Sequence, residues 1–348
     1  MLPGFATPES TARFAGRFHA QEAAGFYRDA QSLSVSSIGL GTYLGEMDDI
    51  TDRGYAEAVV AALKSGVNFI DTSLNYRYQR SERSVGLALR QALDSGFVLR
   101  DEIVICTKAG YLVPDATPKM DARDIVGGMH SMAPAFLADQ LSRSRQNLGV
   151  ETIDVFYLHN PETQLSFIGP DEFYERTRQA FAFLEGAVAQ GEIRHYATAT
   201  WEGYLKPPGS REALSLDRLA EVAGEVAGES HHFRFIQLPF NLAMPEAFRD
   251  RLNDESVLEA AARLGISVVA SASLLQSRLA RDLSEEIRAK LAGARTDAQR
   301  AIQFVRSTPG ISVALVGMSN PEHVRENLGL ATVPPATHDQ YLRLYSPD

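Results

Sequence analysis

Short apolar runs alternate with longer amphipathic patterns along most of the chain. The apolar runs, rich in β-branched residues, predict strands at 35–41, 67–70, 102–107, 153–158, 193–200, 233–238, 266–271 and 311–317. The longer patterns predict helices at 53–66, 81–96, 133–149, 171–191, 215–228, 255–265, 296–310 and 321–330. Continuous apolar strands that alternate with helices are typical of a parallel sheet covered on its faces.

Eight strand–helix units fit either a closed barrel or an open doubly wound sheet. An open sheet that binds a dinucleotide has a glycine-rich turn after its first strand, but the Gly-Leu-Gly at 39–41 lacks the third glycine. We therefore expect an α/β fold, a single-domain (β/α)8 TIM barrel with extended loops at its C-terminal face. The expected boundaries are an N-terminal extension at 1–32, the barrel at 33–330 and a C-terminal tail at 331–348.

Long connections follow several of the predicted strands, at 109–133, 160–170, 201–214 and 272–295, and the last of these contains a helical pattern at 277–293. In a barrel such loops gather at the C-terminal face, where ligand sites lie. Their apolar side chains are unusual for solvated loops, and we expect them to line a pocket: Tyr111, Met129, Met132, Trp201 and Tyr204.

Composition narrows the class of protein. Of the 348 residues 45% are hydrophobic and 22% are charged, which is typical of a soluble globular protein. The net charge of −10 disfavours nucleic acid as a partner, because binding to phosphates needs a basic face. No apolar run predicts a membrane span or a signal peptide. The single cysteine, Cys106, lies in an apolar run and predicts a buried, inert thiol in a cytoplasmic protein.

Consecutive predicted strands end on ionisable side chains, Asp71, Lys108 and His159, and Tyr76 follows in the first of these loops. Neighbouring strand ends of a barrel lie side by side, so we expect these side chains to converge. The lysine would lower the pKa of the phenol, the carboxylate would hold the lysine charged, and the histidine would polarise a carbonyl oxygen. A hydride would have to come from a cofactor. A buried ion pair without catalysis is the structural alternative.

At these residues the chain resembles the aldo-keto reductase family. The segments that match it in order and spacing include "GLGT", "GVNFIDTSLNY", "TKAG", "IDVFYLHNPE", "GEIRHYATATW" and "PGISVALVGMSNPEHVREN". The resemblance implies a (β/α)8 barrel with the catalytic residues Asp71, Tyr76, Lys108 and His159, of which Tyr76 is the general acid. The last segment is most similar to the branch of potassium-channel β subunits and aflatoxin-aldehyde-type reductases.

The resemblance also implies a nicotinamide cofactor, which we expect to be NADP, with NAD as the open alternative. The implied cofactor-binding residues are Gly41, Thr42, Asp71, Thr200, Gln237, Ser271, Leu274, Ser277, Arg278, Gly317, Ser319, Asn320, His323, Glu326 and Asn327. The expected substrate contacts are Tyr43, Tyr111, Asn160 and Trp201. The sequence departs from the family on the nicotinamide side, where Ala199 and Thr200 replace a Ser-Asn pair and Ser271 replaces a stacking aromatic residue.

Two functional hypotheses follow. The first is an NAD(P)H-dependent oxidoreductase that transfers hydride to or from an aldehyde, ketone or sugar-like carbonyl or alcohol. The second is a regulatory subunit that binds the cofactor with little turnover. Arg77 and Arg80 beside the tyrosine would favour an anionic or polyhydroxylated substrate or would be solvated rim charges. The pair His231–His232 has no spacing typical of metal ligands, and we expect no metal. The oligomeric state is left open.

Overall fold

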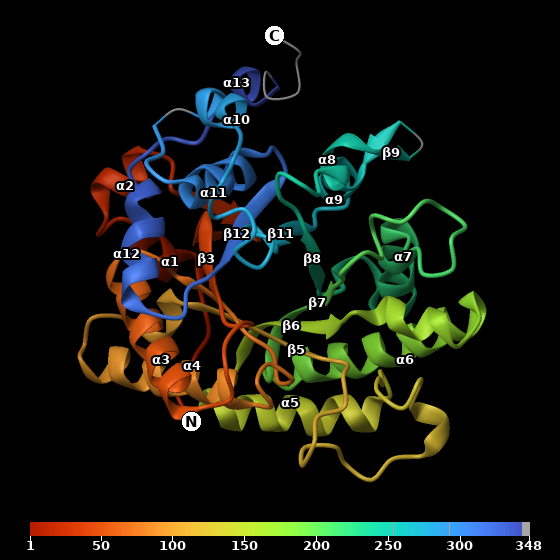
Figure 1. Cartoon of the computed structure of the whole chain (residues 1–348). Helices are drawn as coiled ribbons and strands as arrows, with labels where there is room; N and C mark the ends of the chain where they lie inside the picture. The colour runs from red at the N-terminus through yellow and green to blue at the C-terminus, as the bar shows by residue number, and fades with distance from the viewer. Residues whose placement is uncertain (253, 292, 343–348) are drawn as a thin grey trace.

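The computed structural model describes residues 1–252, 254–291 and 293–342. At its centre is a closed barrel in the strand order β11-β12-β3-β4-β5-β6-β7-β8, whose neighbouring strands are parallel (Figure 1). The barrel strands are β3 (Ile38–Gly41), β4 (Phe69–Asp71), β5 (Val104–Ala109), β6 (Ile153–His159), β7 (Ile193–Ala199), β8 (Phe233–Pro239), β11 (Ser267–Ser271) and β12 (Ile311–Gly317). The predicted (β/α)8 barrel is therefore confirmed.

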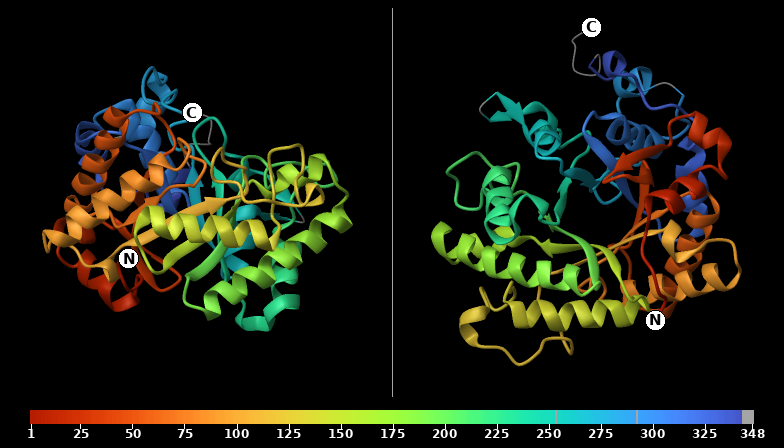
Figure 2. Two further views of the ribbon diagram at one scale, coloured as in Figure 1. Left: turned by 90° about the horizontal axis from the view of Figure 1, so that it is seen from below. Right: turned by 180° about the vertical axis from the view of Figure 1, so that it is seen from behind.

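Helices surround the barrel on its outside (Figure 2). They are α3 (Asp49–Lys64), α4 (Arg80–Asp94), α5 (Pro134–Leu148), α6 (Pro170–Ala189), α7 (Leu216–Ala227), α9 (Val257–Arg263), α11 (Asp297–Ser307) and α12 (Pro321–Asn327). In α4 the side chains of Val85, Ala88, Leu89 and Ala92 are buried, which is the i, i+3, i+4, i+7 spacing of one helix face. Gly149 follows α5 with φ 72°, a left-handed conformation that glycine adopts without strain.

Smaller elements complete the described chain. They are α1 (Pro8–Ala15), α2 (His19–Ala23), β1 (Tyr27–Ala30), β2 (Leu33–Ser36), α8 (Glu246–Arg249), β9 (Arg251–Leu252), β10 (Glu255–Ser256), α10 (Glu285–Lys290), α13 (His338–Leu342) and the short 3-10 helices η1 (Arg100–Glu102), η2 (Ala122–Asp124), η3 (Pro161–Ser166), η4 (Gly228–Ser230) and η5 (Leu328–Leu330). The predicted helix at 277–293 is too long, since α10 is the only helix among the described residues of that range. The end of the expected tail, 343–348, lies outside the described residues.

The predicted first strand at 35–41 is wrong as one element. The chain forms β2 up to Ser36 and then β3, and β2 pairs antiparallel with β1 rather than joining the barrel. The Ser36 hydroxyl donates to the Ile38 carbonyl oxygen at 2.9 Å, which fits a bend between the two strands. The expected boundary at residue 33 therefore falls inside the β1–β2 hairpin.

Apolar side chains fill the barrel interior from its base upward. Leu33 and Val35 of the hairpin join the same buried cluster as the inward-facing Phe69 and Val155. Cys106 belongs to this cluster, and burial raises the pKa of its thiol well above the ordinary value, as expected for an inert cysteine. With the base closed, ligand access is confined to the opposite end. None of the helices in the described ranges is long and apolar enough to cross a membrane.

Candidate active site

A cleft of about 450 Å³ opens at the C-terminal ends of the barrel strands. The expected site residues that line it are Gly41, Thr42, Tyr43, Asp71, Tyr76, Tyr111, His159, Asn160, Thr200, Trp201, Gln237, Ser271, Leu274, Ser277 and Gly317. They come from the ends of all eight barrel strands and from the loops that follow them. Convergence of the strand ends, predicted from the sequence, therefore places most of the expected residues around one space.

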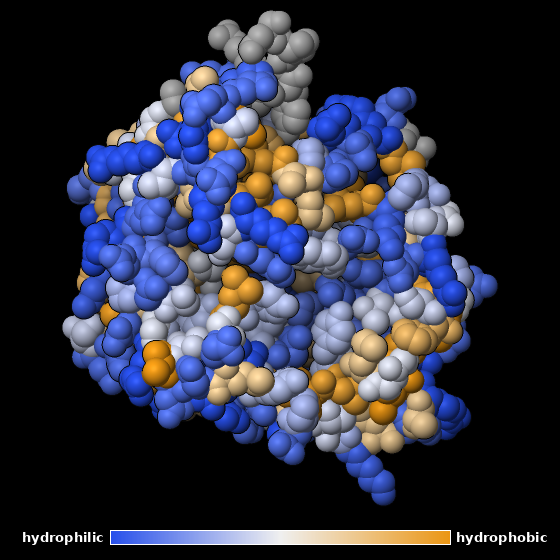
Figure 3. Space-filling model, viewed as in Figure 1, coloured by the Kyte–Doolittle hydropathy of each residue, from blue (hydrophilic) through white to orange (hydrophobic). Residues whose placement is uncertain are grey.

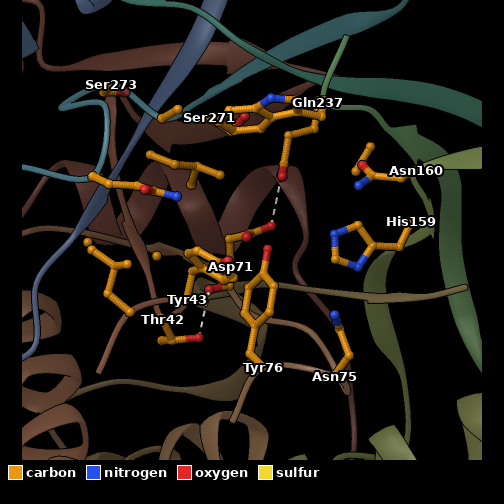
Figure 4. A pocket seen from close by; sticks show the side chains of 18 of the residues that line it. Thr42, Tyr43, Asp71, Asn75, Tyr76, His159, Asn160, Gln237, Ser271 and Ser273 are labelled. Carbon is orange, nitrogen blue, oxygen red and sulfur yellow. Dashed lines mark hydrogen bonds between the residues drawn. The ribbon is translucent and has the colours of Figure 1, made fainter. Parts of the chain in front are cut away.

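Lys108, the penultimate residue of β5, lies at the centre of the expected catalytic group. Its Nζ donates to Asp71 Oδ1 at 2.5 Å, to the Thr72 carbonyl oxygen at 2.9 Å and to the Tyr76 hydroxyl at 3.3 Å. The second carboxylate oxygen of Asp71 accepts from Gln237 Nε2 at 2.9 Å (Figure 4). All three donors of the ammonium are used, so the lysine is held in one position.

The pair formed by Lys108 and Asp71 is almost completely buried, with side-chain exposures of 0% and 4%. Burial disfavours the lysine ammonium, but the Asp71 charge and the hydrogen bonds to Asp71 and Tyr76 outweigh it and raise the pKa of Lys108. Burial raises the pKa of Asp71, although the ammonium acts in the opposite direction. Because three oxygens surround Nζ at hydrogen-bond distance, the ammonium form of Lys108 is favoured.

Tyr76 presents its hydroxyl to the cleft beside the Lys108 ammonium, which also lies 4.8 Å from the centre of the tyrosine ring. The sequence predicted a lowered phenol pKa. Instead burial raises the pKa of Tyr76, and the attraction of Lys108 compensates only in part. The predicted lowering by Lys108 is present, but burial outweighs it, so the phenol is protonated at neutral pH.

His159, the last residue of β6, faces the Tyr76 hydroxyl across the cleft (Figure 4). Its Nδ1 lies 3.2 Å from the hydroxyl oxygen of Ser73, which also donates to Asn75 Oδ1 at 2.6 Å. Burial, the Lys108 charge and a second histidine, His130, hold the pKa of His159 well below its usual value. The imidazole is therefore neutral and fixed in orientation next to the phenol.

His130, which the sequence reasoning missed, lies behind His159. Its Nε2 is 2.8 Å from the His159 carbonyl oxygen, and Gln164 contacts its Nδ1 at 2.9 Å. Burial lowers its pKa to about 4. The Tyr111 ring stands edge-on to both histidine rings, and its hydroxyl accepts from Asn160 Nδ2 at 2.9 Å. A histidine in the middle of a long loop has no local signal that predicts these contacts.

The turn directly after Tyr76 is left-handed at three successive residues, 77–79, with φ values of 47°, 49° and 71°. Residues with a side chain adopt this conformation only at a cost. The Arg77 side chain stabilises the turn through two hydrogen bonds. It donates to Asp52 Oδ1 at 2.6 Å and to the Ser81 hydroxyl at 3.1 Å. Arg80 also pairs with Asp52, at 2.6 Å. These arginines are tied to carboxylates of α3, so their expected role in attracting an anion is not supported.

Comparison with known proteins agrees with this geometry. The model of the Aldo/keto reductase family matches residues 37–346. The chain belongs to the aldo/keto reductase family. The uncharacterized oxidoreductase YqkF of Bacillus subtilis is 20% identical over 327 residues, which cover 90% of this chain and 93% of that protein. As a member of the family, the protein is an NAD(P)-dependent oxidoreductase. The finer branch expected from the last segment stays a prediction.

Solved structures of aldo/keto reductases share the fold. The aldo/keto reductase from Klebsiella pneumoniae, in complex with NADP and acetate, has a TM-score of 0.64 at 21% identity, over 90% of this chain and 92% of that one. The glycerol dehydrogenase from Gluconobacter oxydans has a TM-score of 0.66 at 21% identity, over 92% and 94%. At this identity the likeness concerns the barrel and not the substrate.

On the nicotinamide side, this aldo/keto reductase has two buried hydroxyls that lack a hydrogen-bond partner within the described residues, Thr200 Oγ1 and Ser273 Oγ. Both residues line the cleft. An unpaired hydroxyl in a cleft wall is a ready partner for a polar ligand group. These residues and Gln237 therefore fit a carboxamide, although the Ser-Asn pair and the stacking aromatic residue of the family are replaced.

The remaining expected cofactor residues lie beyond the cleft lining. Asn320 caps α12, accepting from the backbone N–H groups of Glu322 and His323 at 3.0 Å and 2.9 Å. The other expected residues on this side are Arg278, Ser319, His323, Glu326 and Asn327, of which Asn327 is buried and Arg278 is exposed. Arg278 follows β11 and the others follow β12, and none of them lines the cleft next to Tyr76.

Some of the loop residues expected in the pocket lie elsewhere. Met132 is buried in the main core, and the Tyr204 hydroxyl contacts Thr198 Oγ1 at 2.5 Å beneath the surface. Met129 is exposed on the rim, as is Phe167. Figure 3 shows apolar patches on an otherwise mostly polar face of the molecule. Among the residues that the structure describes, no cluster of three or more His, Cys, Asp or Glu is placed to hold a metal ion.

Proposed function

We propose that this aldo/keto reductase is an NADP-dependent reductase of uncharged aldehydes and ketones, with Tyr76 as the general acid. The observation that supports the proposal most strongly is the position of Lys108 Nζ between Asp71 Oδ1 and the Tyr76 hydroxyl, with His159 opposite. A cofactor-binding module without turnover would need no such arrangement.

Each of these side chains has a part in moving one proton. Tyr76 holds the proton at neutral pH and gives it to the substrate oxygen as negative charge develops there. Lys108 stabilises the phenolate that remains, and Asp71 keeps Lys108 charged during the step. In the proposed step the neutral His159 carries its proton on Nε2, and this N–H orients and polarises the carbonyl oxygen.

The cofactor residues of the proposal are Thr200, Ser273 and Gln237 for the carboxamide, and the β12–α12 segment for the adenosine phosphate. A bound reduced nicotinamide supplies the hydride that no side chain can supply. NADP is the expected form, with NAD as the alternative, because His323 stands where the family often has Arg or Gln. A single buried cysteine supports the proposal that the enzyme works in the cytoplasm.

The lining of the cleft supports an uncharged substrate. Among the described residues that line it there is no lysine or arginine, and its open side has the aromatic side chains of Tyr43, Tyr111 and Trp201. A carboxylate or phosphate would lose its hydration without finding a cation. We expect benzaldehyde to be reduced with a kcat/KM about tenfold or more above that of 4-carboxybenzaldehyde. Equal values for the two aldehydes would contradict the neutral substrate class.

The test of the general acid is Tyr76→Phe. Binding of NADPH and NADH is first measured by quenching of the tryptophan fluorescence, and turnover with a carbonyl panel follows. We expect Tyr76→Phe to bind the cofactor normally and to lose about 10²- to 10⁴-fold in kcat. Tyr78→Phe is the matched control, because Tyr78 is 50% exposed two residues away and should keep full activity. Full turnover by Tyr76→Phe would refute the assignment, and cofactor binding without any turnover would favour the regulatory hypothesis.

A further inference from the structure

Glu162 is a buried acidic residue directly below the loop that follows β7. It lies in η3, and its side chain packs under the first turn of that loop. Its Oε1 accepts from the Trp201 backbone N–H at 2.8 Å. The backbone N–H groups of Glu202 and Gly203 also face the carboxylate. The carboxylate therefore accepts a hydrogen bond from the loop backbone at Trp201, and the next two backbone N–H groups lie nearby.

No lysine or arginine forms an ion pair with Glu162 in the part of the chain that the structure describes, and its Oε2 is buried without a hydrogen-bond partner there. The charged side chains of the loop are engaged elsewhere. Lys206 pairs with Glu202 at 3.6 Å and also with Glu212, and Arg211 donates to backbone carbonyl oxygens of η3. The carboxylate is thus held by the backbone of the loop and not by a salt bridge.

The loop that Glu162 holds forms one wall of the cleft, because Thr200 and Trp201 line it. Glu162 itself follows His159 and Asn160 on the neighbouring strand end. We propose that Glu162 is a positioning residue that fixes Trp201, and with it the substrate-facing wall of the cleft, relative to His159. The kinetic part of this inference rests on the proposed function, whereas the position of Trp201 does not.

The ionisation of Glu162 provides a readout. Burial raises its pKa from 4.5 to about 7. The backbone N–H groups of the loop act in the opposite direction, but burial outweighs them. Because the buried, docked state therefore binds the proton more tightly than a free loop, docking is strongest at low pH and weakens as the pH rises through about 7. The protonated carboxyl keeps a carbonyl oxygen as acceptor for the Trp201 N–H and buries no charge.

The other ionisable groups packed nearby do not titrate in this range. The pKa of His130 is lowered to about 4 by burial, and that of His159 lies well below its usual value. Tyr204 lies in the loop after β7, close to Glu162, and burial raises its pKa. The Lys206 side chain pairs with Glu212, and the Arg211 side chain donates to the Leu165 carbonyl oxygen.

Trp201 is the single tryptophan of the chain, so intrinsic fluorescence reports on this loop alone. We expect the enzyme without added cofactor to show a spectral transition with its midpoint near pH 7. Glu162→Gln keeps an acceptor oxygen but cannot ionise, so its spectrum should match the acid form of the wild type over the whole range. Glu202→Gln, on the exposed side of the same loop, is the control and should keep the transition.

The kinetic arm uses benzaldehyde and saturating NADPH. The KM of the wild type should rise as the pH increases through about 7, and the KM of Glu162→Gln should stay at the acid value. Glu162→Ala removes the acceptor and should have a KM that does not vary through this pH range and is about fivefold above the acid value of the wild type, with a smaller effect on kcat, as expected for the loss of one hydrogen bond. If the alanine variant does not fold, the pH dependence of KM and of the fluorescence spectrum in Glu162→Gln still tests the proposal.

A transition near pH 7 that persists in Glu162→Gln, or its absence from the wild type, would overturn the assignment of Glu162. An enzyme without any carbonyl turnover but with the Glu162-dependent transition would contradict the proposed function and still support the position of Trp201.

Discussion

The Asp71→Asn substitution would leave the Lys108 ammonium in the barrel without a carboxylate. The asparagine is almost the same size and can still accept from Gln237, so the change is mainly one of charge. Lys108 has no solvent exposure and its Nζ lies 2.5 Å from the carboxylate. Removing one partner of such a buried pair costs about 3–5 kcal/mol of the free energy of unfolding.

The charge state of the lysine sets a limit on this cost. Without Asp71 burial lowers the pKa of Lys108, and the folded variant can shed the proton instead of burying the charge. Deprotonating a lysine of ordinary pKa at pH 7 costs about 4.6 kcal/mol, which lies within the range of about 3–5 kcal/mol expected for breaking the buried pair. The folded variant then binds fewer protons than the unfolded chain, so its stability rises with pH toward the ordinary pKa of lysine.

Urea unfolding at several pH values measures both effects. The expected deficit is about 3–5 kcal/mol at pH 7, a midpoint shift of roughly 1 M, and it should shrink to about 1–2 kcal/mol near pH 10. Glu172→Gln is the control: it removes the exposed i,i+4 pair with Arg176 and should cost less than about 0.5 kcal/mol. A deficit below about 1 kcal/mol at pH 7, or one that does not narrow toward pH 10, would refute the reasoning.

Further predictions concern packing, the cofactor and the C-terminal segment. A Cβ at Gly86 would lie 2.3 Å from the Asn147 carbonyl oxygen, so Gly86→Ala should lose about 2 kcal/mol or more in thermal unfolding. A Cβ at Gly186 of α6 meets no atom within 4 Å, so Gly186→Ala should gain about 0.5–1 kcal/mol. Thr200→Val should weaken NADPH binding about fivefold in a fluorescence titration, because it removes the unpaired hydroxyl. Arg306→Met should lower the unfolding free energy by about 3 kcal/mol, because this buried guanidinium donates to backbone carbonyl oxygens at 330 and 333; unchanged stability would contradict that role.

The sequence by itself determined the barrel and the core of the candidate site. Hydrophobic periodicity is a local property, and it placed the strands and helices within a few residues of their observed bounds. Asp71, Lys108 and His159 were found because each stands at the end of an apolar run. In a parallel barrel all such ends meet at one rim, so topology turns three local signals into one site.

Only the tertiary structure decided the features that depend on contacts between distant segments. The β1–β2 hairpin closes the barrel base because its apolar residues meet inward-facing strand residues far along the chain. His130 and Glu162 act on neighbouring loops through single hydrogen bonds, which leave no periodic pattern in the sequence. The Arg77 side chain turns to Asp52 instead of the cleft, because a left-handed turn aims it at α3.

The pKa of Tyr76 likewise depends partly on residue types that the sequence shows and partly on burial that only the tertiary structure decides. Residue types alone indicated that Lys108 would lower it, and the contact between the two is present. Its net direction depends on how much water the closed rim excludes, and burial outweighs the lysine charge. Local patterns therefore determined which chemical groups meet, whereas the packing of distant segments decided their protonation and orientation.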